Sequence, residues 1–209
     1  QGKTTRAEAV FYLCTGASLR IRPDRQPTRR GETCARISAE ASTRFGSVSL
    51  EAAIFENKRE LYLNGNRLAR AADFVGNMNS VFFSPGELRL IQDGPDERRR
   101  FLNLSISQTS REYCTALARY QRILDQRNNL LKERDVSLVL ETLPVWDEQL
   151  ALFAARIVRH RRRYLKQLSP LASDAHAYLT DGAEKLSLDM DGRYPDEEGE
   201  IAEKLLKEF

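Results

Sequence analysis

The sequence predicts an α/β fold with two lobes, residues 1–108 and residues 109–209. The prediction rests on the period with which apolar residues recur along the chain. Between about residues 34 and 63 apolar and polar residues alternate, as in antiparallel strands; from about Pro95 onward apolar residues recur every three to four positions, as in helices. One amphipathic helix precedes the strands. The first lobe therefore combines a helix with a β-meander, and the second is a helical hairpin.

The composition is that of a folded, charge-rich chain. Of its 209 residues, 41% are hydrophobic and 30% charged, which excludes collagen-like and low-complexity classes. The longest apolar run, Ala9 to Cys14, has about six residues, far short of the ~20 that span a bilayer, so no membrane partner is expected. Three cysteines lie far apart, which predicts reduced thiols in a cytoplasmic protein.

In the first lobe, residues 4–13 carry apolar positions three to four apart and predict a helix with one buried face. The Arg- and Pro-rich stretch 17–31 predicts an exposed loop. Alternating residues in 34–43 and 48–55 predict two strands, and residues 61–63 lead into Asn-Gly, a strong hairpin signal. These strands form the antiparallel meander.

The last part of the first lobe predicts one more strand and then a helix. Val81-Phe82-Phe83 is apolar throughout, which favours a short strand buried on both faces. Pro95 suits the first turn of a helix, and Asp96 and Glu97 suit the positive end of its dipole.

Two long helical stripes follow in the second lobe. One lies between Tyr113 and Leu131 and the other between Trp146 and Leu168, with the rhythm of a coiled coil. A short loop near Pro144 is expected to join them into a hairpin, and Pro170 to kink or end the second helix.

A short strand, a turn and a helix are expected at the C-terminal end of this lobe. Residues 185–190 alternate as a strand does, Asp191-Gly192 predicts the turn, and residues 201–209 begin the helix. The chain starts without Met and ends without a helix stop signal, so we expect it to be part of a longer protein that lacks both ends here.

Gly2-Lys3-Thr4-Thr5, directly before the first helix, has the form of the second half of a Walker A motif. In such a motif the helix N-terminus holds phosphate, the lysine reaches the β- and γ-phosphates, and the hydroxyl of the next residue ligates Mg²⁺. Lys3 and Thr4 would take the last two roles. A bare G-K-T occurs by chance in about one chain in ten of this length, so the following helix is what strengthens the assignment.

Positive charge is concentrated in the first 170 residues, which carry a net +10, whereas residues 171–209 carry −7. Arginine presents a planar fork of donors that suits phosphate, which predicts contact with DNA or RNA. For the arginines of the second arm helix, the alternative to DNA contact is a solvated or salt-bridged position on the flank of a coiled coil. For residues 98–100, the alternative is a role in packing between the lobes. The candidate DNA-binding residues are Arg20, Arg22, Arg25, Arg29, Arg30, Arg98, Arg99, Arg100, Arg159 and Arg163.

Five blocks of the chain, in order and spacing, resemble the RecF family. They are QGKTTRAEAVFYLCTGASLR, LNGNRL, VFFSPGELRLIQDGPDERRRFLN, YQRILDQRNNLLKE and WDEQLALFAARIVRHRRRYLKQLSPLA. The resemblance covers essentially the whole chain. It implies a partial ABC-type ATPase head, made of a β-meander plus a P-loop helix, with a helical-hairpin second lobe.

The resemblance also implies ATP and Mg²⁺ as cofactors, with Gly2, Lys3, Thr4 and Thr5 at the nucleotide and the Thr4 hydroxyl on the metal. It implies an ATP-driven homodimer that binds single- and double-stranded, gapped DNA. It further implies cooperation with RecR and RecO in placing RecA at single-stranded gaps, in recombinational repair and the SOS response.

A slow, DNA-stimulated ATPase activity is expected of the longer parent, and this chain alone is expected to be inactive. The family's Walker B carboxylates and signature motif lie downstream of this chain, so the catalytic residues are unknown. The family's S-P-E block is altered here, because Gly86 replaces the usual Glu and Glu87 follows one position later. That change leaves a Q-loop-like role for Glu87 open.

Two kinds of alternative are open at this point. One is another ABC-type head, RecN-like or an overcoming-lysogenisation-defect nuclease, although both usually carry a larger insertion or a longer coiled coil. The other is a helical interaction module in which the G-K-T is incidental. Flanking sequence would decide, because a G-x-N-G before Gln1 and an L-S-x-G-[QE] after Phe209 belong to the ATPase class.

Overall fold

The computed structural model describes residues 2–17, 32–44, 46–56, 58–84, 88–190 and 194–209. The chain forms two compact units, Gln1–Cys114 and Thr115–Phe209. In the described residues, no helix is both long and apolar enough to cross a membrane.

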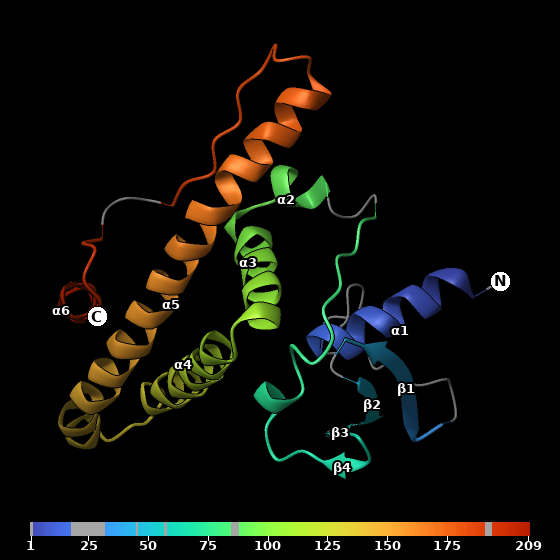
Figure 1. The fold of residues 1–209 in the computed structure, drawn as a ribbon. Helices are drawn as coiled ribbons and strands as arrows, with labels where there is room; N and C mark the ends of the chain where they lie inside the picture. The colour runs from blue at the N-terminus through green and yellow to red at the C-terminus, as the bar shows by residue number, and fades with distance from the viewer. Residues whose placement is uncertain (1, 18–31, 45, 57, 85–87, 191–193) are drawn as a thin grey trace. The chain divides into compact units, whose positions relative to one another are not determined.

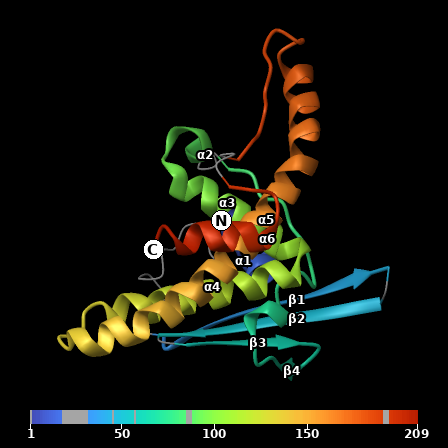
Figure 2. The same cartoon turned by 90° about the vertical axis from the view of Figure 1, so that its left-hand side faces the viewer.

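The first unit begins with α1 (Lys3–Thr15), which packs on a four-stranded antiparallel sheet (Figure 1). Sheet order follows chain order, and Figure 2 shows the strands side by side. This confirms the predicted helix and meander. Asn64 and Gly65 both have positive φ, as the Asn-Gly turn requires. The strands are β1 (Cys34–Thr43), β2 (Gly46–Phe55), β3 (Arg59–Leu63) and β4 (Asn66–Arg67).

The register of the sheet gathers its apolar residues on one face. Ile37 pairs with Ala52, which pairs with Leu61. Because side chains alternate along a strand, Leu50 and Ile54 point to the same side as Ala52. This face packs with α1 to form the core of the first unit, whose buried members are Tyr12, Leu13, Leu50, Ala52, Ile54, Leu61 and Phe74.

The expected strand at residues 81–83 is wrong. No residue of the described sheet pairs with this segment, and a strand exists only through such pairing. Val81 and Phe83 are 101% and 82% exposed, whereas Phe82 packs against Phe11 of α1 with ring centroids 5.8 Å apart. The apolar triplet therefore lies extended with only its central side chain in contact with the helix.

Three helices follow the meander: α2 (Arg89–Gln92), α3 (Pro95–Thr109) and α4 (Arg111–Leu130). The predicted start of α3 is confirmed, with Pro95 in its first turn after the Gly94 cap. Between the meander and these helices lies the 3₁₀ turn η1 (Ala71–Asp73).

The second unit is built on α5 (Val136–Leu179), a helix of 44 residues. The expected loop at Pro144 is wrong, and α5 does not end at Pro170, because both prolines lie inside α5. The alternative expectation of a kink at Pro170 stays a prediction. The connection from α4 lies at residues 131–135 instead, where the Asp135 side chain caps α5 by accepting from the Leu138 amide at 3.2 Å.

α4 and α5 form the predicted hairpin (Figure 2). Arg127 on α4 donates to the Asp147 carboxylate on α5 at 2.5 Å, and both side chains are largely buried. The final helix, α6 (Glu198–Leu206), starts three residues before the expected position and packs on α5. The small core there joins Ala151, Ala155 and Val158 of α5 to Ile201 and Leu205 of α6.

Residues 185–190, expected as a strand, form none, although their alternation has a structural basis. Leu186, Leu188 and Met190 are partly buried and the residues between them exposed. The Leu188 amide donates to the Ser169 hydroxyl of α5 at 3.1 Å, and Met190 packs against the α5–α6 core. An extended segment laid along a helix thus shows the same two-residue period as a strand.

Candidate functional site: the start of α1

The predicted Gly-Lys-Thr segment forms the first turn of α1. Gly2 caps the helix in a left-handed conformation, with φ of 99°, and its carbonyl accepts from the Arg6 amide at 3.0 Å. Lys3, Thr4 and Thr5 follow on the first turn, and all are exposed. The structure therefore brings the four predicted nucleotide-binding residues together at one open helix end.

This helix end can hold an anion. The first amides of a helix have no partner within it, and Gly2 has no side chain with which to cap them. They and the helix dipole favour a phosphate at this position. The Lys3 ammonium adds a positive charge and the Thr4 hydroxyl adds a neutral oxygen suited to Mg²⁺. The donor set fits a nucleotide phosphate with its metal.

The other end of α1 is fixed in the core. Residues Phe11 to Thr15 are buried, and the Thr15 hydroxyl donates to the Phe11 carbonyl at 2.8 Å. Gly16 then ends the helix in a left-handed conformation, and its carbonyl accepts from the Arg59 guanidinium of β3 at 2.5 Å. The Gly-Lys-Thr turn therefore lies at the exposed end of a helix whose other end is fixed in the core.

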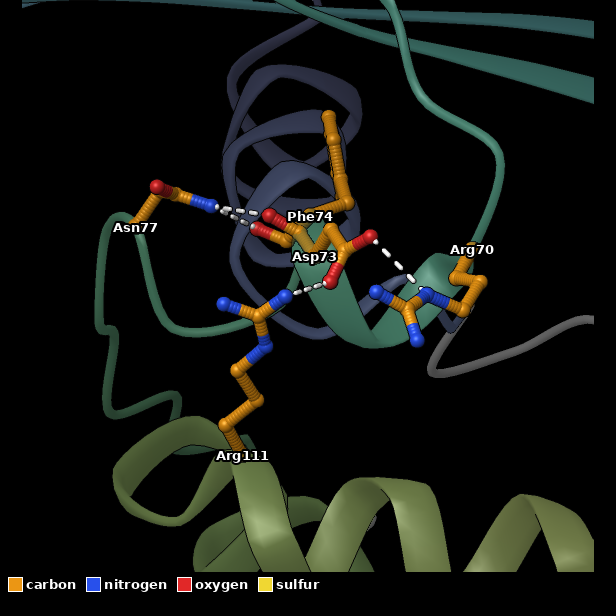
Figure 3. A network of polar contacts seen from close by, with 5 residues as sticks. All are labelled: Arg70, Asp73, Phe74, Asn77 and Arg111. Atoms are coloured by element: carbon orange, nitrogen blue, oxygen red, sulfur yellow. Dashed lines mark hydrogen bonds and ion pairs between the residues drawn. The ribbon is translucent and has the colours of Figure 1, made fainter.

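A polar network that sequence reasoning missed surrounds Asp73 (Figure 3). The Asp73 carboxylate pairs with Arg70 at 3.2 Å through one oxygen and with Arg111, the first residue of α4, through the other. The Asn77 amide donates to the main-chain oxygens of Asp73 and Phe74, both at 2.8 Å. The only local signal was the i,i+3 spacing of Arg70 and Asp73.

A second set of contacts joins residues 70–80 to the end of α3. The Gln108 side-chain oxygen accepts from the Ser80 amide at 2.8 Å. Gly76, with φ of +89°, lies so close to the Gln108 carbonyl that a Cβ there would approach it to 2.9 Å. Residues 70–80 are thus tied to the junction of α3 and α4 at more than one point.

The described candidates for DNA binding form two groups, Arg98, Arg99 and Arg100 near the start of α3 and Arg159 with Arg163 on α5. Arg99 pairs with Asp96 and Arg100 with Glu97 at 3.8 Å, within the first turns of α3. The Arg98 side chain donates to the Asp93 carbonyl at 3.2 Å. Arg20, Arg22, Arg25, Arg29 and Arg30 lie outside the described residues, as do Gly86, Glu87 and the expected Asp191-Gly192 turn.

In the second unit, arginines of α5 contact the first residue of α6 and the segment before it. Glu198 pairs with Arg156 at 3.2 Å and with Arg159 at 2.8 Å. Arg162, which sequence reasoning did not single out as a candidate, donates to the main-chain oxygens of Tyr194 and Pro195. Arg163 is exposed. Contact of Arg159 and Arg163 with DNA stays a prediction.

The shifted pKa values in the first unit accompany structural rather than nucleophilic groups. Burial raises the pKa of the Cys14 and Cys114 thiols, which keeps them protonated at neutral pH. Hydrogen bonds from Tyr62 and, second, from Lys58 lower the pKa of the Glu60 carboxyl. The hydrogen bond between Tyr62 and Glu60 also raises the pKa of the Tyr62 hydroxyl. Over the described residues, His, Cys, Asp and Glu form no group of three or more that could hold a metal.

The helices and the antiparallel sheet described above are those of an ABC-type ATPase fold. Two solved structures of the recombination mediator protein RecF in the RecFOR pathway, RecF-ATPrS and RecF-ATP, resemble the chain with TM-scores of 0.83 and 0.84. Sequence identity is 29% and 28%, over 100% and 99% of this chain and 57% of each solved chain.

Similarity to curated sequences identifies the family within this fold class. The chain is 36% identical over 211 residues to the DNA replication and repair protein RecF of Halothermothrix orenii, covering 100% of this chain and 56% of that protein. It is 37% identical over 193 residues to that of Geobacillus kaustophilus, covering 90% and 51%. The chain belongs to the RecF family and spans about half the length of the curated relatives it matches. No protein-family model matches it.

Proposed function

We propose that this chain is the phosphate-binding and arm portion of a RecF-type protein that binds ATP and acts on DNA in replication and repair. The observation that carries the proposal is the open first turn of α1, where Gly2, Lys3, Thr4 and Thr5 meet. The likeness of the whole chain to a solved RecF-ATP structure supports a nucleotide as the anion that this turn binds. The cytoplasm is the proposed compartment.

In this proposal each residue of the turn has one task. The first amides of α1 orient the phosphates, the Lys3 ammonium spans the β- and γ-phosphates, and the Thr4 hydroxyl ligates Mg²⁺. Bound ATP supplies the γ-phosphate whose presence or loss distinguishes two states of the protein. Slow hydrolysis is proposed for the longer parent, with a carboxylate that this chain does not identify.

We further propose an ATP-driven homodimer that binds single- and double-stranded, gapped DNA and helps to load RecA with RecR and RecO. The net +10 of residues 1–170 supports an anionic polymer as partner. The ion pairs of Arg99, Arg100 and Arg159 mean that DNA would compete there with carboxylates. The arginines of residues 17–31, which the sequence predicts to form a loop and which lie largely outside the described residues, are proposed for the main contact.

The test is ATP binding by a RecF-length protein that contains this chain, followed by fluorescence of a labelled nucleotide. Lys3→Ala removes a charge-assisted contact of about 1.5–3 kcal/mol, a weakening of about 10- to 100-fold. Lys166→Ala removes an exposed lysine of α5 and is the matched control. Equal affinities for wild type and Lys3→Ala would contradict the proposal and favour a helical module with an incidental G-K-T.

A further inference from the structure

α4 begins in one unit and ends in the other. Its first residues, Arg111 to Cys114, belong to the first unit, and its remaining residues belong to the second. A helix of 20 residues is about 30 Å long, so a tilt of about 10° at its root moves its far end by about 5 Å. Whatever fixes the root of α4 therefore controls where the arm begins.

Two side chains at the root of α4 contact two different elements. Tyr113, fully buried, donates through its hydroxyl to the Asn103 side chain of α3 at 2.6 Å. Arg111 is held by the Asp73 carboxylate, which comes from the turn after the meander. A helix held at one point can pivot, whereas two attachments to different elements define its direction.

The turn that carries Asp73 is in turn seated on α1. Phe74 is 0% exposed and packs in the core with Tyr12 and Leu13 of α1. A Cβ built on Gly16, at the end of the same helix, would lie 3.5 Å from the Val75 side chain, so this side chain is close to the end of α1. Contacts thus run without a break from the helix that bears the phosphate turn, through η1, to the first residue of α4 (Figure 3).

We propose that Asp73 and Arg111 are positioning residues: their ion pair sets the direction of α4 from the position of α1, and so couples the nucleotide site to the arm. The coupling rests on the proposed ATP binding, whereas the geometric role does not. Neither residue belongs to the turn of residues 2–5 that is proposed to hold the nucleotide. Loss of the pair therefore changes the response to ATP rather than the affinity for ATP.

Arg70 supplies a matched control inside the same network. It pairs with the other oxygen of the Asp73 carboxylate, and its side chain is 71% exposed, close to the 67% of Arg111. Removing either arginine costs a similar, small amount of stability, because both are exposed ion pairs. Only Arg111 lies on α4, so only its removal should affect the arm.

The geometric role is tested in this chain by pulsed electron resonance. Spin labels on ketone-bearing amino acids replace exposed Glu40 on β1 and Lys166 on α5, which leaves the cysteines untouched. Arg111→Ala should broaden or shift the distance distribution by about 5 Å, the motion expected from a 10° tilt. Arg70→Ala and Arg111→Lys should match wild type. Equal distributions for both alanine variants, narrow or broad, would overturn the positioning role.

The coupling is tested in a RecF-length protein by titrating a mixed-sequence DNA duplex with and without ATP. Arg111→Ala should reduce the ATP-induced gain in DNA affinity at least about threefold, with ATP affinity unchanged, while Arg70→Ala keeps the full gain. An unchanged gain, or an equal loss of ATP affinity itself, overturns the coupling. If wild type binds no ATP, the proposed function fails and the coupling with it, while the label experiment still decides the geometric role.

Discussion

Replacing Gly76 by alanine should destabilise the first unit more than the same replacement at another left-handed glycine. Gly76 has φ of +89°, which L-residues adopt at a cost of about 1–2 kcal/mol. A Cβ there would also stand 2.9 Å from the Gln108 carbonyl, a backbone atom at the end of α3. That atom can move only if the helix end or the loop moves with it.

Gly65 separates the two effects. Its φ of +78° is similar, but a Cβ there meets nothing within 4 Å. Alanine also restricts the unfolded chain, which offsets the backbone cost by about 0.4–1 kcal/mol at either site. We therefore expect a loss of about 1 kcal/mol for Gly65→Ala, and the forced shift at Gly76 should add about 1–3 kcal/mol.

The measurement is urea unfolding of this chain, followed by tryptophan fluorescence and by circular dichroism. The two signals are needed because the single tryptophan, Trp146, lies in the second unit, whereas the substitution is in the first. Comparison requires that the dependence of unfolding free energy on urea be the same in both variants. If Gly76→Ala and Gly65→Ala lose equal stability, the close approach to Gln108 has no energetic weight and the reasoning fails.

Three further outcomes follow from contacts elsewhere. Gly199→Ala, in α6 with nothing within 4 Å of its Cβ, should raise the free energy of unfolding by about 0.5–1 kcal/mol, and an unchanged value would contradict this. Asp147→Ala should cost about 2–4 kcal/mol, because it leaves the largely buried Arg127 unpaired; a loss below about 0.5 kcal/mol would mean that solvent reaches Arg127. In a RecF-length protein, neutralising the arginines of residues 17–31, predicted as a loop, should flatten the dependence of log K for DNA on log salt by about 0.7–0.9 per lost contact, more than Arg159→Ala does. Equal slopes for all variants would mean that the net positive charge of residues 1–170 does not contact DNA.

The meander and α1 could be predicted because their signals are local. Alternation fixes which face of a strand is buried, and Asn64-Gly65 fixes the turn between β3 and β4. The Gly-Lys-Thr turn was equally local, since its residues are consecutive. The Asp73–Arg111 pair was not predictable, because 38 positions separate the two residues and no pattern relates them.

The prolines of α5 show where a local rule gives way to its surroundings. A proline inside a helix removes the bond to the carbonyl four residues earlier, at a cost of about 3 kcal/mol. For Pro144 and Pro170 these carbonyls belong to Leu140 and Lys166, and all four residues are exposed. Water can therefore satisfy both carbonyls, and the apolar packing of α5 keeps the helix continuous.

Segments 81–83 and 185–190 failed as strands for a related reason. An apolar or alternating pattern states which side chains seek burial, but not what will cover them. In residues 185–190 the cover is α5, reached through Ser169 and the α5–α6 core, so the pattern is satisfied without any sheet. In residues 81–83 only Phe82 finds a partner, on α1. The two-residue period is thus evidence for one-sided burial, and a sheet is only one of the surfaces that can supply it.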